Sequence, residues 1–227
     1  MLSKFKELFG SENLLDEAFN TTLKMLKSDH KMYKASRSTL RETGTDELPF
    51  DIKKMDRRIN KHLREVRRNV LTHLTIAGTQ NIVPGLALVS IVIDVERIGD
   101  YTKNISELAT LHPKRLIGGP FEDDIVKMEG VIKETFPQVL HVLTEQDIDE
   151  ASAILKREDK MGKIADHILS SLITKQNKSF STSSAICLAI YVRQLKRVNA
   201  HLTNIASSIS NPFPRIGFRQ KPKNKKK

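Results

Sequence analysis

Hydrophobic residues recur about every three to four positions along almost the whole chain, which is the spacing of one face of an α-helix. Leu15, Phe19, Leu23 and Leu26 begin the first such stripe. No run of β-branched residues alternates with polar ones between turn signals, as a half-buried strand requires. The pattern therefore predicts long helices and no strand. Six helices are expected, approximately over residues 14–43, 46–74, 78–111, 123–143, 147–175 and 181–210.

Two prolines and one acid bear on where these helices start. Asp46 is expected to cap the second helix, and Pro49 suits its first turn. Pro84 lies inside the third helical segment, where a proline removes a backbone hydrogen bond, so we expect a kink or a later start there. The third and sixth segments are the most apolar, which predicts that they lie at the centre and face each other.

One segment of the chain occurs twice. Residues 95–105 read VERIGDYTKNI and residues 195–205 read LKRVNAHLTNI, with an arginine, an asparagine and an isoleucine unchanged. A repeat of this kind predicts a duplicated fold. We therefore expect an all-α protein, built as a duplicated three-helix bundle of six long antiparallel helices. Its parts are an amphipathic segment at 1–10, a first repeat at 11–111, a linker at 112–120, a second repeat at 121–211 and a basic tail at 212–227.

The basic charge of the chain is concentrated at its end. The 227 residues carry a net charge of +11, but the tail from Pro212 onward holds seven lysines and arginines and no acid. Without them, 31 basic residues stand against 27 acidic ones. The tail is predicted to be disordered and to act as a solubilising end. The alternative is an anchor to anionic lipid or nucleic acid, helped by the amphipathic start.

Hydropathy and cysteine content favour a cytoplasmic protein. No apolar run approaches the roughly 20 residues that cross a bilayer, and residues 1–10 lack the apolar core of a secretion signal. The single cysteine, Cys187, excludes an internal disulfide and is expected to be an inert core thiol. We expect a cytoplasmic location, and peripheral contact with the inner face of the membrane stays open.

Candidate chemistry lies in carboxylates of the second and third helices. Glu96 and Asp100 are four residues apart, so both project from one helix face. Asp56 and Asn60 share that spacing, and two such pairs meeting across an interface would form an oxygen-rich cage for Mg, Ca, Mn or iron. On spacing alone, such pairs are more often solvated faces with ordinary salt bridges, and Asp94 is expected to belong to that class.

The segment IDVERIGD at residues 93–100, followed by Asn104 and Glu107, resembles the signature of the PhoU family of phosphate-response regulators. The resemblance spans residues 11–210 and implies a duplicated three-helix bundle. It implies repression of phosphate uptake and of the phosphate-starvation response, through a phosphate transporter and a sensor histidine kinase. It also implies a divalent metal or iron, as one site or cluster, held in the first repeat by Glu96, Asp100, Asp56 and Asn60.

The second repeat lacks the residues for the same site. Lys196 and Ala200 replace the two carboxylates of the motif. Asp159 matches Asp56, but Lys163 follows it by four residues, where the first repeat has Asn60. Ammonium groups repel a cation and are expected to neutralise Asp159, so the second site is predicted to be lost. His201 is expected to form hydrogen bonds in the core.

Three further residues of the repeated segment have expected roles. Asn204 is predicted to join His201 as a hydrogen-bonding group of the core. Arg97 and Arg197, which occur in both copies, are expected to form interhelical salt bridges.

The sequence shows no recognisable motif of an enzyme active site. No nucleophile motif or glycine-rich phosphate loop occurs, and the seven histidines are scattered. We therefore predict a regulator that binds partners and is not an enzyme, with a homodimer compatible with the bundle. The alternative is a metal-free helical adaptor that docks on a membrane or partner through its basic tail and amphipathic start. Nucleic acid is disfavoured because no recognition motif occurs.

Overall fold

The computed structural model describes residues 11–45, 47–174 and 179–218. Within these ranges the chain is helical and contains no strand, which confirms the all-α prediction. The predicted amphipathic segment 1–10 and the last part of the predicted tail 212–227, residues 219–227, lie outside the described residues. The long helices are α2 (Ser11–Ser38), α3 (Ile52–Ala77), α4 (Ile82–Leu111), α5 (Glu122–Glu145), α6 (Ile148–Thr174) and α7 (Thr182–Ser210). Short helical turns are η1 (Thr39–Thr43, π-helical), η2 (Gly78–Asn81), η3 (Gly119–Phe121) and η4 (Phe213–Arg215).

One helix start differs from the sequence prediction, that of α3, and one agrees with it, that of α4. α3 begins after Asp51, whose carboxylate accepts a hydrogen bond from the backbone N–H of Lys54 at 2.9 Å and so caps the helix. Pro49 therefore precedes the helix, and the predicted cap Asp46 lies outside the described residues. α4 starts late enough to put Pro84 in its first turn, where the missing N–H needs no intrahelical partner.

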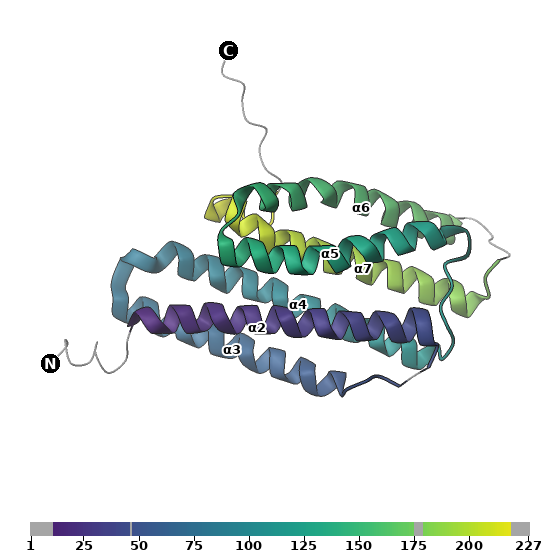
Figure 1. Cartoon of the computed structure of the whole chain (residues 1–227), viewed down its shortest axis with the longest axis horizontal. Helices are drawn as coiled ribbons and strands as arrows, with labels where there is room; N and C mark the ends of the chain where they lie inside the picture. Colours follow the sequence, from purple (N-terminus) through teal and green to yellow (C-terminus); the bar gives the residue numbers. More distant parts are fainter. Residues whose placement is uncertain (1–10, 46, 175–178, 219–227) are drawn as a thin grey trace, which may run out of the picture.

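The helices form two bundles that meet along α4 and α7 (Figure 1). α2, α3 and α4 pack together in the first bundle, and α5, α6 and α7 in the second. Val95 and Ile98 of α4, like Leu195 and Val198 of α7, are fully buried. The two most apolar helices thus lie at the centre, as predicted, while α3 and α6 lie at opposite edges of the molecule (Figure 1).

A buried carboxylate, Glu129 of α5, joins the two bundles. Arg37 of α2 donates two hydrogen bonds to its Oε2, from Nε at 3.0 Å and from Nη2 at 2.9 Å. Its Oε1 accepts from Arg41 Nε at 2.8 Å and from the Tyr191 hydroxyl of α7 at 2.7 Å. Glu129 is 3% exposed, so these donors replace the water that a buried carboxylate loses.

Arg41 also holds the linker at 112–120 against the first bundle. Arg41 lies in η1 and donates from Nη1 to the carbonyl of Leu116. The N–H of Leu116 donates to the carbonyl of Leu40 at 2.9 Å, and the Leu116 side chain is fully buried. Arg115 returns a hydrogen bond to the Arg41 carbonyl at 3.0 Å. The linker is therefore held against the first bundle through Leu116, although most of its other residues are exposed.

Asp94 of α4 makes a second polar contact between the bundles. Its Oδ1 lies 2.6 Å from His201 Nδ1 and accepts a hydrogen bond from Asn204 Nδ2 at 3.1 Å, both on α7. The His201 ring stacks on Tyr101 with a centroid distance of 5.4 Å. The prediction that Asp94 lies on a solvated face was wrong, because α7 covers it, and the predicted hydrogen-bonding roles of His201 and Asn204 are confirmed.

The segment after α7 is folded back, contrary to the prediction of disorder from residue 212. η4 packs on α4 and α7. Asn211 Nδ2 donates to the carbonyls of Arg215 at 3.0 Å and Phe218 at 2.7 Å. The N–H of Gly217 donates to Ser207 Oγ at 2.7 Å. Backbone groups of residues 213–218 thus find partners that the sequence pattern does not reveal.

Replacing Glu129 by Gln should destabilise the protein by about 3 kcal/mol, because the guanidinium groups of Arg37 and Arg41 lose their shared buried counter-charge. Urea unfolding at neutral pH measures the change. The matched control is Glu42→Gln, which removes a 53% exposed partner of Arg37 and should cost less than about 1 kcal/mol. Equal losses in the two variants would contradict the assignment of Glu129 as the link between the bundles.

Candidate functional site

The predicted site residues of the first repeat lie on two helices that pack against each other. Asp56 and Asn60 are on α3, and Glu96 and Asp100 are on α4. Lys103 of α4 donates from Nζ to Asp56 Oδ2 and to Asp100 Oδ1, each at 3.2 Å. The structure therefore brings Asp56 and Asp100 to one place, with an ammonium group between them.

Glu96 lies beside this pair in a partly buried position. Its side chain is 14% exposed, and burial raises the pKa of its carboxyl, with further contributions from the charges of Asp100 and Asp56. Arg97 lies with Nε 3.7 Å from Glu96 Oε2 and donates from Nη1 to Asp100 Oδ2 at 3.3 Å. Both partners are on its own helix, so the predicted interhelical salt bridge of Arg97 was wrong. Arg197 is exposed on α7.

Asn60 is held at the edge of the group by its own helix. Its Nδ2 donates to the backbone carbonyl of Asp56 at 3.2 Å. The amide nitrogen is thereby occupied, and the side-chain oxygen is the atom of Asn60 that can meet a cation.

Asp29 of α2 is a fourth carboxylate of this group, which the sequence analysis missed. It is fully buried, and neither of its side-chain oxygens has a hydrogen-bond partner among the described residues. Burial raises the pKa of Asp29 well above its usual range, and the charges of Asp56, Glu96 and Asp100 raise it further. An unpaired buried carboxyl is costly unless a proton or a cation compensates it.

Gly99 allows the close approach of Asp29 to α4. A Cβ at this position would lie 2.9 Å from Asp29 Oδ1 and 3.2 Å from Ile59 Cδ1. The glycine of the motif thus leaves room for a carboxylate from a different helix. A lone acid within the apolar stripe that includes Met25 and Met32 was the signal that could have revealed Asp29, because such a residue is rarely buried without a role.

We name Asp29, Asp56, Glu96 and Asp100 the first-repeat carboxylate cluster. It joins α2, α3 and α4, and its nearest compensating groups are Lys103 and Arg97. All its donor atoms are oxygens, which suits hard divalent cations and iron. A cation between Asp56 and Asp100 would take the position of the Lys103 ammonium.

Among the residues of the second repeat that the structure describes, no equivalent cluster occurs. Ile132 follows Asp29 by the same interval that separates Asp56 from Asp159, so it takes the place of Asp29 in the second repeat. It is fully buried. Lys196 forms an ion pair with Asp166 of α6 at 2.5 Å, a partner that the sequence analysis did not consider. Lys163, Asp159 and Lys196 line one pocket between α6 and α7. The ammonium groups of Lys163 and Lys196 would repel a cation, so we expect none to bind in this pocket.

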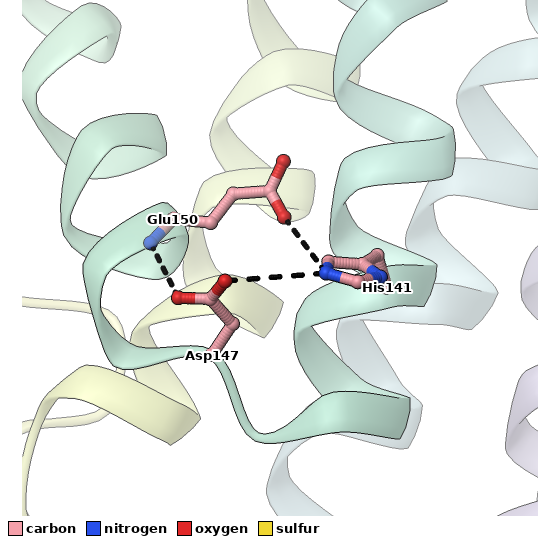
Figure 2. A group of neighbouring side chains, drawn as sticks. All are labelled: His141, Asp147 and Glu150. Atoms are coloured by element: carbon pink, nitrogen blue, oxygen red, sulfur yellow. Dashed lines mark hydrogen bonds and ion pairs between the residues drawn. The ribbon is translucent and has the colours of Figure 1, made fainter.

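A second group of side chains that could bind a metal lies at the turn between α5 and α6 (Figure 2). Among the described residues, only His141, Asp147 and Glu150 bring three such ligand atoms within 4.8 Å of one another. His141 Nε2 is 3.9 Å from Asp147 Oδ2 and 3.6 Å from Glu150 Oε2. Asp147 also accepts the Glu150 N–H at 2.9 Å, and the His141 side chain is 54% exposed. We interpret the group as the N-terminal cap of α6, with the His141 imidazole lying beside its carboxylates.

Replacing Gly99 by Ala should destabilise the protein by about 1–3 kcal/mol, because the new methyl group must displace Asp29 and Ile59. Thermal or urea unfolding measures the loss. The control is Gly162→Ala in α6, where an added Cβ meets nothing within 4 Å. It should stabilise the helix by up to about 1 kcal/mol. A neutral Gly99→Ala variant would argue against the close approach of α2.

In protein treated with chelator, Asp29 should make stability fall as pH rises. Its folded pKa is raised, so its contribution is fully present below the unfolded pKa of about 3.9 and is lost as pH rises toward the folded value. The slope for one proton is at most about 1.4 kcal/mol per pH unit. Urea unfolding from about pH 4 to about pH 8 should show a steeper fall in the wild type than in Asp29→Asn, in which only Glu96 of the cluster keeps a raised pKa. Parallel curves for the two proteins would refute it.

Comparison with known proteins agrees with this architecture. The family model of the PhoU domain matches the chain twice, over residues 22–109 and 125–209. The phosphate-specific transport system accessory protein PhoU homolog of Synechocystis is 26% identical over 169 residues, which are 72% of this chain and 74% of that protein. The homolog of the same name from Deinococcus radiodurans is 23% identical over 203 residues, 86% of this chain and 92% of that protein.

Two crystal structures have the same fold. PhoU from Pseudomonas aeruginosa superposes with a TM-score of 0.77 at 18% identity, covering 87% of this chain and 96% of that one. The phosphate transport system regulatory protein PhoU from Streptococcus pneumoniae gives 0.77 at 14% identity, covering 88% and 94%. Because the two domain matches together span well over half of the sequence, one in each three-helix bundle, the chain belongs to the PhoU family.

Proposed function

We propose that this protein is a cytoplasmic regulator of a phosphate-specific transport system, which represses phosphate uptake and the phosphate-starvation response. The names of its relatives, accessory proteins of such a transport system, support this class of function. The chain would act by associating with the transporter, a sensor histidine kinase or both, and not by catalysis.

The first-repeat carboxylate cluster is proposed to bind a divalent metal or iron, as a single ion or a small cluster. One observation carries this proposal: Asp29 is fully buried, without a hydrogen-bond partner among the described residues, and close enough to three other carboxylates to be affected by their charge. A cation would compensate all four groups together. Its donors would be Asp29, Asp56, Glu96 and Asp100, with the Asn60 side-chain oxygen beside them. These side chains would have to close on the ion, because no three of the four carboxylates bring oxygens within 4.8 Å of one another.

A bound cation would fix the relative positions of three helices. Asp29 comes from α2, Asp56 from α3, and Glu96 and Asp100 from α4, so a shared ion would tie these helices together. Lys103 would swing away from Asp56 and Asp100 to make room. A bound ion would supply positive charge and would hold α2, α3 and α4 in one arrangement, which a partner could contact at the outer surface of the first bundle.

A metal-free adaptor is the second candidate, and the position of Lys103 favours it. Its ammonium already lies 3.2 Å from both Asp56 and Asp100, so part of the negative charge is compensated inside the chain. In this case the carboxylates serve only to hold α3 against α4, and Asp29 carries a proton. The two candidates differ in whether an added cation stabilises the fold.

Adding manganese or iron(II) to chelator-treated protein should raise its melting temperature. At a metal concentration about one hundred times Kd, preferential binding to the folded state adds about 2.7 kcal/mol of stability. The Glu96→Gln/Asp100→Asn variant should lose this gain. Elemental analysis of protein purified without chelator or nickel resin should show metal in the wild type and none in the variant.

The matched control for this experiment is Glu150→Gln, which alters the group at the α5–α6 turn and leaves the first repeat unchanged. It should keep the full metal-dependent rise. A rise that survives in Glu96→Gln/Asp100→Asn but is lost in Glu150→Gln would move the cation to that turn. The absence of any rise in the wild type would favour the metal-free adaptor.

A further inference from the structure

The outer face of α3 is strongly basic. The helix carries eight lysines and arginines against two acids, Asp56 and Glu65. All eight are exposed, and none forms an ion pair with a carboxylate of the described residues. They are Lys53, Lys54, Arg57, Arg58, Lys61, Arg64, Arg67 and Arg68. The near balance of charge over the whole chain therefore hides a local surplus of cations.

Helical spacing places these cations on one side of α3. Residues three and four apart share a helix face, so the basic positions form one continuous surface. The opposite side carries Ile59, Val66 and Val70, which are buried against α2 and α4. α3 forms one edge of the molecule (Figure 1). The basic face thus points away from the bundle.

The second repeat shows that the fold does not require this charge. α6 occupies the position in the second bundle that α3 has in the first, at the opposite edge (Figure 1). It carries four basic residues and five acidic ones. Eight like charges on a short surface repel one another and weaken the compact state. The duplicated helix avoids that cost, so the cations of α3 point to a negatively charged partner.

Exposed aliphatic side chains lie near the end of α3 and at the start of α4. Leu71 follows Arg67 and Arg68 by about one turn of α3 and is 69% exposed. Beyond the end of the helix, Val83 is 60% exposed and Leu86 is 40% exposed at the start of α4. Cations next to aliphatic side chains suit the surface of an anionic bilayer, where headgroups meet the cations and the acyl boundary accepts the aliphatic groups. No described helix has a stretch long and apolar enough to cross a membrane.

We propose that the basic face of α3, together with the aliphatic residues that follow it, docks the protein on an anionic phospholipid membrane. The docking places the regulator proposed above at the bilayer that contains its transport system. It does not use the first-repeat carboxylate cluster, so the loss of metal binding and the loss of membrane binding are separate results.

Sedimentation with lipid vesicles tests this docking on the full chain. The wild type should bind vesicles of phosphatidylcholine mixed with phosphatidylglycerol. It should not bind vesicles of pure phosphatidylcholine. Binding should weaken as salt is added, because screening acts on exposed charges. Replacing Arg58, Arg64 and Arg68 together by Gln should weaken binding by about tenfold or more. Circular dichroism and the melting temperature confirm that the variant is folded.

The matched control replaces three exposed lysines of α6, Lys156, Lys160 and Lys163, by Gln. It removes the same charge from the opposite edge and should bind vesicles within about twofold of the wild type. A second variant that ends at residue 218 should also retain binding. Equal losses in the α3 and α6 variants, or loss only in the shortened chain, would overturn the proposal. The proposal would also be overturned if the wild type did not bind anionic vesicles.

Discussion

The relative position of the two bundles depends on the ion pairs and hydrogen bonds of one buried carboxylate, that of Glu129. The carboxylate is buried, and it is stable there only because Arg37, Arg41 and Tyr191 all reach it. These donors come from α2, η1 and α7, so the two repeats must adopt one relative position for all of them to bind. Apolar packing between α4 and α7 has no such directional requirement, and the polar contacts therefore select one arrangement among those that bury similar area.

Arg41 connects the Glu129 contact to the linker between the bundles. Arg41 binds Glu129 on one side and the Leu116 carbonyl on the other, so the linker is fixed where the bundles meet. Asp94 with His201 and Asn204 gives a further directional contact along the central helices. A change in the first bundle would thus reach the second through buried polar groups that cannot be left unpaired without a cost.

Duplication has allowed the two repeats to carry different chemistry on one fold. Asp29 corresponds to Ile132, Glu96 to Lys196 and Asp100 to Ala200, so an acidic cluster in one repeat becomes an apolar and basic region in the other. The outer helices differ in the opposite sense, since α3 is strongly basic and α6 is not. Both differences lie in side chains that the backbone fold does not need, which is why the first repeat can acquire sites without loss of the common architecture.

The sequence by itself determined the helices, the duplication and the central place of α4 and α7, because periodicity, capping and turn residues act between near neighbours. It also placed Glu96 with Asp100 and Asp56 with Asn60, since each pair lies on one helix. Only the tertiary structure decided which residues meet across helices. Asp29 approaches the cluster past Gly99, Lys103 reaches Asp56, Asp94 faces His201, and the chain after α7 folds back. These contacts join residues far apart in the sequence, and local spacing carries no information about them.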